Sequence, residues 1–152
     1  MKPRTFKIGT TWVGGGHPVF IIAEIGINHD GKFTQALKLI DAAAAASCSA
    51  VKFQLFTAER MYTKDAGSYR TASGKRKDII EIIKATELPT HWIPKLKRYA
   101  NSKGLEFFSS LFDEKNADVL EHYKADAYKI ASSEAAHLPL IRHVAKKKKP
   151  VL

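Results

Sequence analysis

The stretch from Ala127 to Glu134, AYKIASSE, places one lysine inside a short apolar run that ends in hydroxyls and a carboxylate. Burying an unpaired ammonium group is costly, so Lys129 in a strand indicates that an anionic group meets it there. The alternative is that Lys129 lies on an edge strand and extends its ammonium group into solvent. From this stretch alone, both interpretations stay open.

Three earlier runs also carry polar residues near their carboxyl ends: Glu24 in the first, Lys52 and Gln54 in the second, and Ser110 in the third. Lys52 and Gln54 share one face because side chains alternate along a strand. Strand ends of this kind converge where parallel α/β proteins bind ligands. Two lysines with hydroxyls suit a ligand carrying phosphate and carboxylate groups, and Glu24 is then a natural base or water-positioning group. The structural alternative is a capping or ion-paired role for Glu24 and an ion pair for Lys52.

The elements that must position these residues alternate between β-rich runs and helical periodicity, which is typical of β/α units around a parallel sheet. We expect strands at 19–26, 50–56, 106–112 and 127–132, and the start of a fifth at 150–152. Helices are expected after Asp30 and Gly31, over 79–83, near Thr90, after Asp113 and from Pro139. The run at 6–13 predicts a small hairpin before the first sheet strand.

Four strand-to-helix units and a fifth strand leave two architectures open, because a complete eight-unit barrel needs about 250 residues. The chain is either a small open α/β sheet or the first half of a barrel. The polar stretch at 57–77 has no clear period and is expected to be a long functional loop.

The 152 residues, 45% of them hydrophobic, correspond to one domain or part of one. Cys48 is the single cysteine, so an internal disulfide is excluded. The amino-terminal residues lack the apolar core of a signal peptide, and Glu24 interrupts the longest apolar run. We therefore expect a cytoplasmic protein with no membrane association.

The net charge of +10 would suit nucleic acid, an anionic membrane surface or a phosphorylated small molecule. Much of the excess lies in KRK at 75–77 and KKKK at 146–149. Short lysine runs are typical of solvated helix ends, and no zinc-ligand spacing or RNA-binding aromatic signature accompanies them. Nucleic-acid binding is therefore a weak alternative, and we expect no nucleic-acid partner.

Four motifs in this order resemble the sialic acid synthase family: FIIAEIGINHDG at 20–31, AVKFQ at 50–54, FFSSLF at 107–112 and AYKIASSE at 127–134. The long segment at 54–75, QLFTAERMYTKDAGSYRTASGK, is similar to the branch named for spore coat polysaccharide biosynthesis. The resemblance implies the N-terminal half of a TIM (β/α)8 barrel at 19–152, comprising strands 1 to 4 and the start of strand 5. A hairpin region at 1–18 would precede it.

Enzymes of that family condense phosphoenolpyruvate with an N-acyl hexosamine aldehyde, which gives a nonulosonic acid such as N-acetylneuraminate and releases phosphate. The resemblance implies that Glu24 orients or deprotonates the water that adds during the reaction. It assigns four residues to phosphoenolpyruvate: Lys52, Ser110, Lys129 and Ser132. It places Gln54 and Glu134 toward the sugar, with Asn28 and His29 as further possible site residues; a histidine at such a turn more often orders the loop.

The family also uses a divalent metal, typically manganese, to polarise the sugar aldehyde. Its two histidine ligands belong to the second half of the barrel, so we expect them to be absent here and assign no metal ligand. A homodimer is implied for the full-length protein. Two departures stand out: Leu111 replaces a proline common in relatives, and Ser133 replaces a common glycine.

Two other functions remain open at this point. One is a non-catalytic half-barrel that binds an anion or pairs with another chain. The other is a synthase that makes a 3-deoxy sugar acid from phosphoenolpyruvate and a phosphorylated aldose.

Overall fold

A four-stranded parallel sheet forms the centre of the computed structural model, which describes residues 4–70 and 74–152. The strands pair in chain order, each parallel to the next: β3 (Ile22–Gly26), β4 (Ala50–Leu55), β7 (Glu106–Leu111) and β8 (Tyr128–Ile130). Val151 adds a parallel bridge to Tyr128, where the fifth strand is expected. Neighbours in space are thus neighbours in sequence, as in a β/α barrel.

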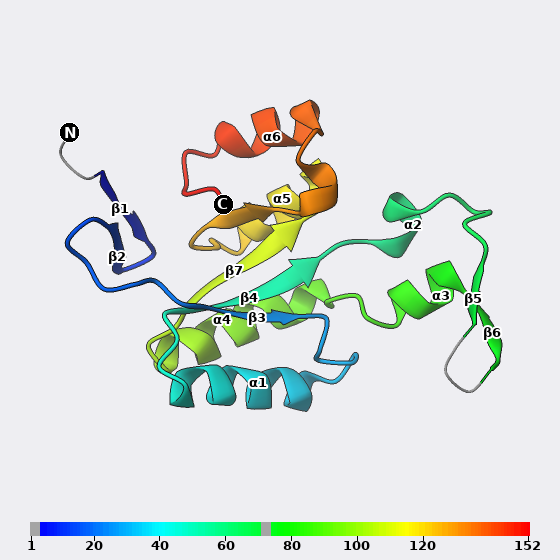
Figure 1. Ribbon diagram of the computed structural model, residues 1–152, viewed down its shortest axis with the longest axis horizontal. Coiled ribbons are helices and arrows are strands. Elements are labelled where there is room, and N and C mark those ends of the chain that lie inside the picture. The colour runs from blue at the N-terminus through cyan, green and yellow to red at the C-terminus, as the bar shows by residue number, and fades with distance from the viewer. Residues whose placement is uncertain (1–3, 71–73) are drawn as a thin grey trace.

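A helix follows each strand and packs against the outer face of the sheet (Figure 1). The helices are α1 (Phe33–Ala45), α4 (Ile93–Ser102) after the short 3₁₀ turn η1 (Thr90–Trp92), α5 (Glu114–His122) and α6 (Leu138–Ala145). Local sequence explains their starts. Asp113 caps α5 by accepting a hydrogen bond from the Asn116 backbone at 2.7 Å, and α4 and α6 each have a proline in the first turn.

The main core lies between the sheet and these helices. Along β4, the outward-facing Val51, Phe53 and Leu55 are almost completely buried. The inner face has a smaller apolar layer made by Ala50, Phe108 and Ala127, together with Ile8 of the hairpin. The alternating pattern of the strands therefore separates two apolar layers, as period-two side-chain placement requires.

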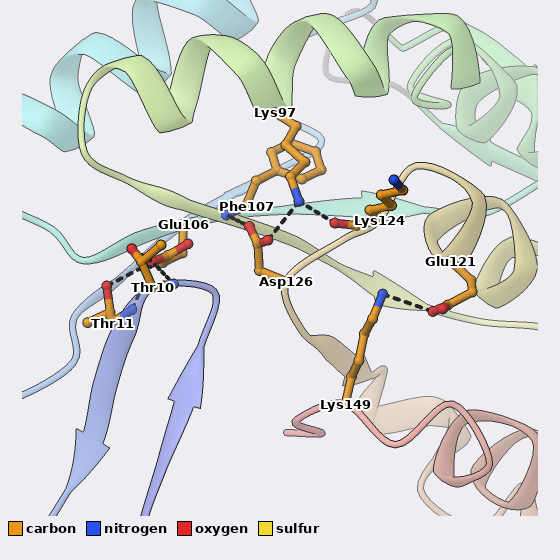
Figure 2. A network of polar contacts seen from close by, with 9 residues as sticks. All are labelled: Thr10, Thr11, Lys97, Glu106, Phe107, Glu121, Lys124, Asp126 and Lys149. Atoms are coloured by element: carbon orange, nitrogen blue, oxygen red, sulfur yellow. Dashed lines mark hydrogen bonds and ion pairs between the residues drawn. The ribbon is translucent and has the colours of Figure 1, made fainter.

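The predicted hairpin closes the amino end of the sheet. Strands β1 (Thr5–Ile8) and β2 (Thr11–Gly14) pair antiparallel, and the hairpin lies at the opposite end of the molecule from the strand tips (Figure 1). Its turn is fixed by Glu106, whose Oε1 accepts hydrogen bonds from the backbone and hydroxyl groups of Thr10 and Thr11 at 2.8–3.0 Å (Figure 2). Gly9 in this turn has a φ of 57°, and a Cβ there would lie 1.9 Å from Glu106 Oε2.

The prediction of one long loop over 57–77 is wrong for part of that stretch, which has regular elements. It contains α2 (Ala58–Met61) and the antiparallel pair β5 (Ser68–Arg70) and β6 (Arg76–Asp78), which leads into α3 (Ile79–Lys84). Residues 71–73 lie outside the described part of the chain. Strands of three residues are too short to produce a readable period, which explains the error.

Two of the predicted strand boundaries shift by more than one residue. The first sheet strand begins at Ile22 rather than 19, and β8 ends at Ile130, so that Ser132 lies in the 3₁₀ turn η2 (Ser132–Glu134) and not in the strand. Within the described ranges, no helix combines the length and apolar character needed to cross a membrane.

Candidate functional site

A hollow of about 380 Å³, open to solvent, lies where the carboxyl ends of the strands converge. Every strand of the parallel sheet, or the turn that follows it, contributes polar side chains to its lining: Glu24, Lys52, Gln54, Ser110, Lys129 and Ser132. These six are residues that the sequence singled out, so the parallel sheet brings them together as predicted. Beyond the apolar layer of Ala50, Phe108 and Ala127, the inner face is thus polar at the carboxyl end.

Lys52 lies at the floor of the hollow and is only 2% exposed. Its Nζ donates a hydrogen bond to Ser110 Oγ at 3.1 Å and forms an ion pair with Glu24 Oε2. The side chain of Glu24 is 60% exposed and reaches toward solvent. The burial cost of the lysine is therefore offset by one carboxylate, while that carboxylate keeps a second oxygen and an open side toward the hollow.

A β-bulge lies next to Glu24, at the end of β3 that borders the hollow. The register between β3 and β4 shifts between Glu24 and Gly26, and Gly26 adopts a left-handed φ of 57°. A Cβ added at Gly26 would come within ordinary contact distance of the Gln54 side chain. Bulges redirect side chains at the ends of strands, and the glycine permits the backbone conformation that this one needs.

The surroundings of Lys129 favour the first interpretation of the AYKIASSE stretch, in which this lysine meets an anionic group. It is partly buried on β8 and lines the hollow, and none of the described acidic side chains forms an ion pair with it. Ser132 and Ser133 follow from the turn η2 and line the same wall. The lining residues thus include two lysines and one carboxylate, which leaves an excess of one positive charge with hydroxyl donors beside it.

Three predicted site residues do not line the hollow. The Glu134 carboxylate lies beside His137 instead, with Oε2 2.9 Å from the ring Nδ1. Asn28 and His29 belong to the turn after β3. The resemblance placed Glu134 toward the sugar, but Glu134 is the last residue of η2 and its carboxylate contacts His137.

His29 orders its turn from a buried position. The side chain is fully buried, and its Nδ1 accepts a hydrogen bond from the Gly31 backbone at 3.2 Å. The proton of the neutral ring is therefore on Nε2, which has no hydrogen-bond partner among the described residues; the His29 and Trp92 rings meet edge to face with centroids 5.9 Å apart. Burial lowers the pKa of His29 below its usual value, so the ring stays neutral.

The opposite wall of the hollow is apolar, and the sequence patterns did not predict it. Its residues include Ile27, Phe56, Met61, Tyr62, Ile83 and Phe112. Phe56 and Phe112 directly follow β4 and β7, and their rings meet edge to face with centroids 5.6 Å apart, so their places one residue beyond two strands were a usable signal. Met61, Tyr62 and Ile83 come from α2, its C-cap and α3, which carry no such signal.

Polar contacts hold this wall in place. Arg60 of α2 forms an ion pair with Asp113 at 2.9 Å, which joins the wall to the cap of α5. The Ala58 backbone donates to Glu87 at 2.7 Å, which closes the segment on itself. The wall therefore has a defined position relative to the strand ends.

Metal-ligating groups are not clustered in the described part of the chain. Across residues 4–70 and 74–152, no three side chains among histidine, cysteine, aspartate and glutamate lie together in a way that could hold a metal ion. Glu24, the carboxylate at the hollow, is paired with Lys52. The described residues therefore do not fit a metal site.

The amino-acid sequence matches the family model described as the NeuB family over residues 39–152. It is 50% identical over 147 residues to the spore coat polysaccharide biosynthesis protein SpsE of Bacillus subtilis, covering 97% of this chain and 39% of that protein. It is 36% identical over 142 residues to the N,N'-diacetyllegionaminic acid synthase of Legionella pneumophila, covering 91% and 40%. The chain therefore spans about 40% of the length of these curated relatives.

The fold is similar to that of a solved sialic acid synthetase. The crystal structure of N-acetylneuraminic acid synthetase from Leptospira borgpetersenii, in complex with citrate, superimposes with a TM-score of 0.84 at 30% sequence identity. The likeness covers 98% of this chain and 48% of that one. It confirms the predicted fold class, the α/β arrangement of a TIM barrel, of which the four parallel strands form a part.

Proposed function

This chain belongs to the NeuB family, and from that premise we propose that it carries the phosphoenolpyruvate-binding half of a nonulosonic acid synthase. The reaction joins phosphoenolpyruvate to an N-acyl hexosamine in its aldehyde form and releases phosphate. Relatives that carry synthase names make legionaminic and sialic-type acids, which supports this class of product.

The observation that carries the proposal is the surplus of positive charge at the strand ends. Lys52 and Lys129 approach the hollow from β4 and β8, with Ser110 and Ser132 beside them and Glu24 as the acidic group. Phosphoenolpyruvate carries a phosphate and a carboxylate a few bonds apart, so two cations and two hydroxyl donors match its two anionic ends. The buried Lys52 is held by Ser110, which makes its position well defined.

The chemistry proposed for these residues is that of the family reaction, and their positions at the hollow are compatible with it. The enol carbon of phosphoenolpyruvate forms a bond to the aldehyde carbon, the aldehyde oxygen takes the electron pair of the C=O bond and a proton from solvent, and positive charge develops at the phosphate-bearing carbon. Glu24, exposed beside Lys52, accepts a proton from the water that adds to that carbon, and phosphate then leaves as the keto acid forms. Lys52 and Lys129 stabilise the anionic groups throughout, and Gln54 contacts the sugar.

A divalent metal would supply Lewis-acid polarisation of the sugar aldehyde. The residues in the described ranges do not fit such a site, so we propose that its ligands come from the part of the enzyme beyond this chain. The steps assigned to Glu24 and the lysines do not pass through it.

A hybrid protein tests the proposal. These residues replace the matching segment of the Bacillus subtilis relative, to which they are 50% identical, and phosphate release from phosphoenolpyruvate is measured with N-acetylmannosamine and manganese. The unmodified relative and the 152-residue chain are assayed beside it. We expect phosphate release, dependent on the sugar, from the hybrid and not from the chain alone.

Three other results would count against the proposal. Release with a phosphorylated aldose but with no N-acyl hexosamine would indicate a 3-deoxy sugar acid synthase. A folded hybrid that is inactive with every acceptor, beside an active unmodified relative, would indicate a non-catalytic role. Turnover by the 152-residue chain alone would contradict its assignment as one half of the catalyst.

A further inference from the structure

The apolar wall of the hollow has no part in the chemistry proposed above. Its members include Met61 of α2, Ile83 of α3 and Phe112, which directly follows β7. All three side chains are partly exposed while they line the hollow, so some of their apolar surface is available to a ligand. Phosphoenolpyruvate is anionic and the hydroxyl groups of a sugar are hydrophilic, so neither is stabilised by contact with this surface. The wall therefore suits a ligand group that is itself apolar.

Ion pairs hold the two helices that carry this wall. Glu59 and Lys84 pair at 2.7 Å and thereby join α2 to α3. Met61 directly follows Arg60, whose guanidinium pairs with the cap residue of α5 at 2.9 Å, and Ile83 directly precedes Lys84. The position of the two helices thus limits how far the hollow extends on this side.

The acceptor of the proposed reaction has one apolar group close to its reacting atom. In a hexosamine the aldehyde carbon is bonded to the carbon that bears the nitrogen, so the acyl group lies only a few bonds from the carbon that joins to phosphoenolpyruvate. The amide of that group can form hydrogen bonds, whereas its alkyl end is stabilised only by apolar contact. Because the aldehyde must meet phosphoenolpyruvate near Lys52 and Lys129, the alkyl end must enter the same hollow.

We propose that Met61 and Ile83 bind the alkyl end of the acyl group and set the length of acyl chain that the enzyme accepts. The inference rests on the proposed function, because it concerns the acceptor of that reaction. Phe112 completes the surface, and its ring is held edge to face against Phe56 with centroids 5.6 Å apart. A wall of fixed position rejects a longer chain, since extra methylene groups would force its side chains apart.

The test measures kcat/KM of the hybrid protein for mannosamine that carries an acetyl, a propanoyl or a butanoyl group. Without further substitution, we expect kcat/KM to fall by about tenfold or more from the acetyl to the butanoyl compound. Ile83→Ala shortens the wall and should raise the ratio of kcat/KM for butanoyl to that for acetyl by about tenfold. Met61→Ala should change this ratio in the same direction, and KM for phosphoenolpyruvate should stay unchanged in both variants.

The matched control is Ile82→Ala, which makes the same replacement in the same helix. Ile82 is partly buried, as Ile83 is, but it does not line the hollow. Its replacement should leave the butanoyl-to-acetyl ratio within about twofold of that of the hybrid. The ratio does not depend on the fraction of enzyme that is folded, because that fraction scales kcat/KM equally for every acyl group. A destabilised variant therefore still reports on the acyl chain.

The outcomes separate the inference from the function on which it rests. A loss of kcat/KM in Ile83→Ala that is equal for the three acyl groups would overturn the acyl-binding role and leave the synthase function standing. Two further results would also overturn it: an equal kcat/KM for the three groups in the hybrid itself, or a change of the ratio in Ile82→Ala as large as in Ile83→Ala. A folded hybrid that is inactive with every acyl group would contradict the proposed function, and the acyl-binding role with it.

Discussion

Glu106 and Glu24 lie on the same inner face of one sheet, at its opposite ends, and their surroundings differ sharply. Glu106 is 4% exposed, and its carboxylate accepts four hydrogen bonds from Thr10 and Thr11. Glu24 has a 60% exposed side chain, and its carboxylate pairs with Lys52 through one oxygen. The carboxylate of Glu106 is buried and serves as an acceptor within the fold, while that of Glu24 is exposed toward the hollow.

The same difference appears in the lysines. Lys97 at the amino end forms an ion pair with Asp126 at 2.6 Å and also donates to the Lys124 carbonyl, while the other Asp126 oxygen accepts from the Phe107 backbone at 3.0 Å (Figure 2). At the carboxyl end, Lys129 forms no ion pair with any acidic residue in the described part of the chain. Buried polar groups are usually satisfied within a protein, so unused capacity gathered at one hollow indicates a ligand.

Removing Glu106 should have the largest effect on stability. Glu106→Ala deletes the acceptor of four hydrogen bonds and leaves the turn of the hairpin without a partner, so the free energy of unfolding should fall by about 3 kcal/mol. Denaturation in urea measures the change, and Glu106→Gln, which keeps one oxygen, should lose less. A loss below about 1 kcal/mol for the alanine variant would remove the distinction between the two ends.

Removing Lys129 should weaken ligand binding and leave stability nearly unchanged. Lys129→Ala should weaken phosphoenolpyruvate binding by about tenfold to a hundredfold, because one charged hydrogen bond is lost, while stability changes by less than about 0.5 kcal/mol. Calorimetric titration of the hybrid and urea denaturation of the same protein provide both numbers. Unchanged affinity would contradict the role assigned to this lysine.

Gly9 allows a finer test of the amino end. Gly9→Ala introduces a Cβ against Glu106 in a left-handed turn and should cost about 2 kcal/mol. Gly16→Ala is the matched control, since Gly16 also has a positive φ, of 86°, but a Cβ added there would meet no atom of the described residues within 4 Å. The excess cost at Gly9 measures the contact with Glu106, and equal costs would show that backbone strain alone is responsible.

His29 should give the smallest effect, visible only as a pH dependence. Its pKa is lowered in the folded state by burial, so the unfolded chain binds the proton more readily. Stability should therefore fall as the pH falls below about 6.5, by at most about 1.4 kcal/mol per pH unit until the folded pKa is reached. His29→Asn keeps an acceptor for the Gly31 amide and cannot titrate, so the difference between wild-type and variant curves should grow toward low pH. Parallel curves of stability against pH for the two proteins would contradict the claim that His29 causes this pH dependence.

The sequence allowed much of the fold and of the polar site to be predicted, because both depend on local patterns. Period-two alternation placed Lys52 and Gln54 on one face, and the order of the β/α units brought Glu24, Ser110, Lys129 and Ser132 to the same end of the sheet. The predicted roles of these residues stay predictions until ligand binding is measured.

What the sequence did not reveal depends on contacts between distant residues or on short turns. The acceptor role of Glu106 joins residues 96 positions apart, which no local pattern encodes. The turn η2 directs Glu134 toward His137, and a single 3₁₀ turn leaves no period to read. The short helix α2, which supplies Met61 to the hollow, leaves no period to read, and although the helix over 79–83 was predicted, its approach to the hollow through Ile83 was not.

The most direct test of the difference between the two ends is a titration of the 152-residue chain with phosphoenolpyruvate, followed by amide NMR shifts. We predict shifts at Lys52, Ser110, Lys129 and Ser132, and none at Thr10, Thr11 or Glu106. Shifts centred on the amino end, or spread evenly over the exposed lysines, would contradict the claim that the carboxyl ends of the strands form the anion-binding site.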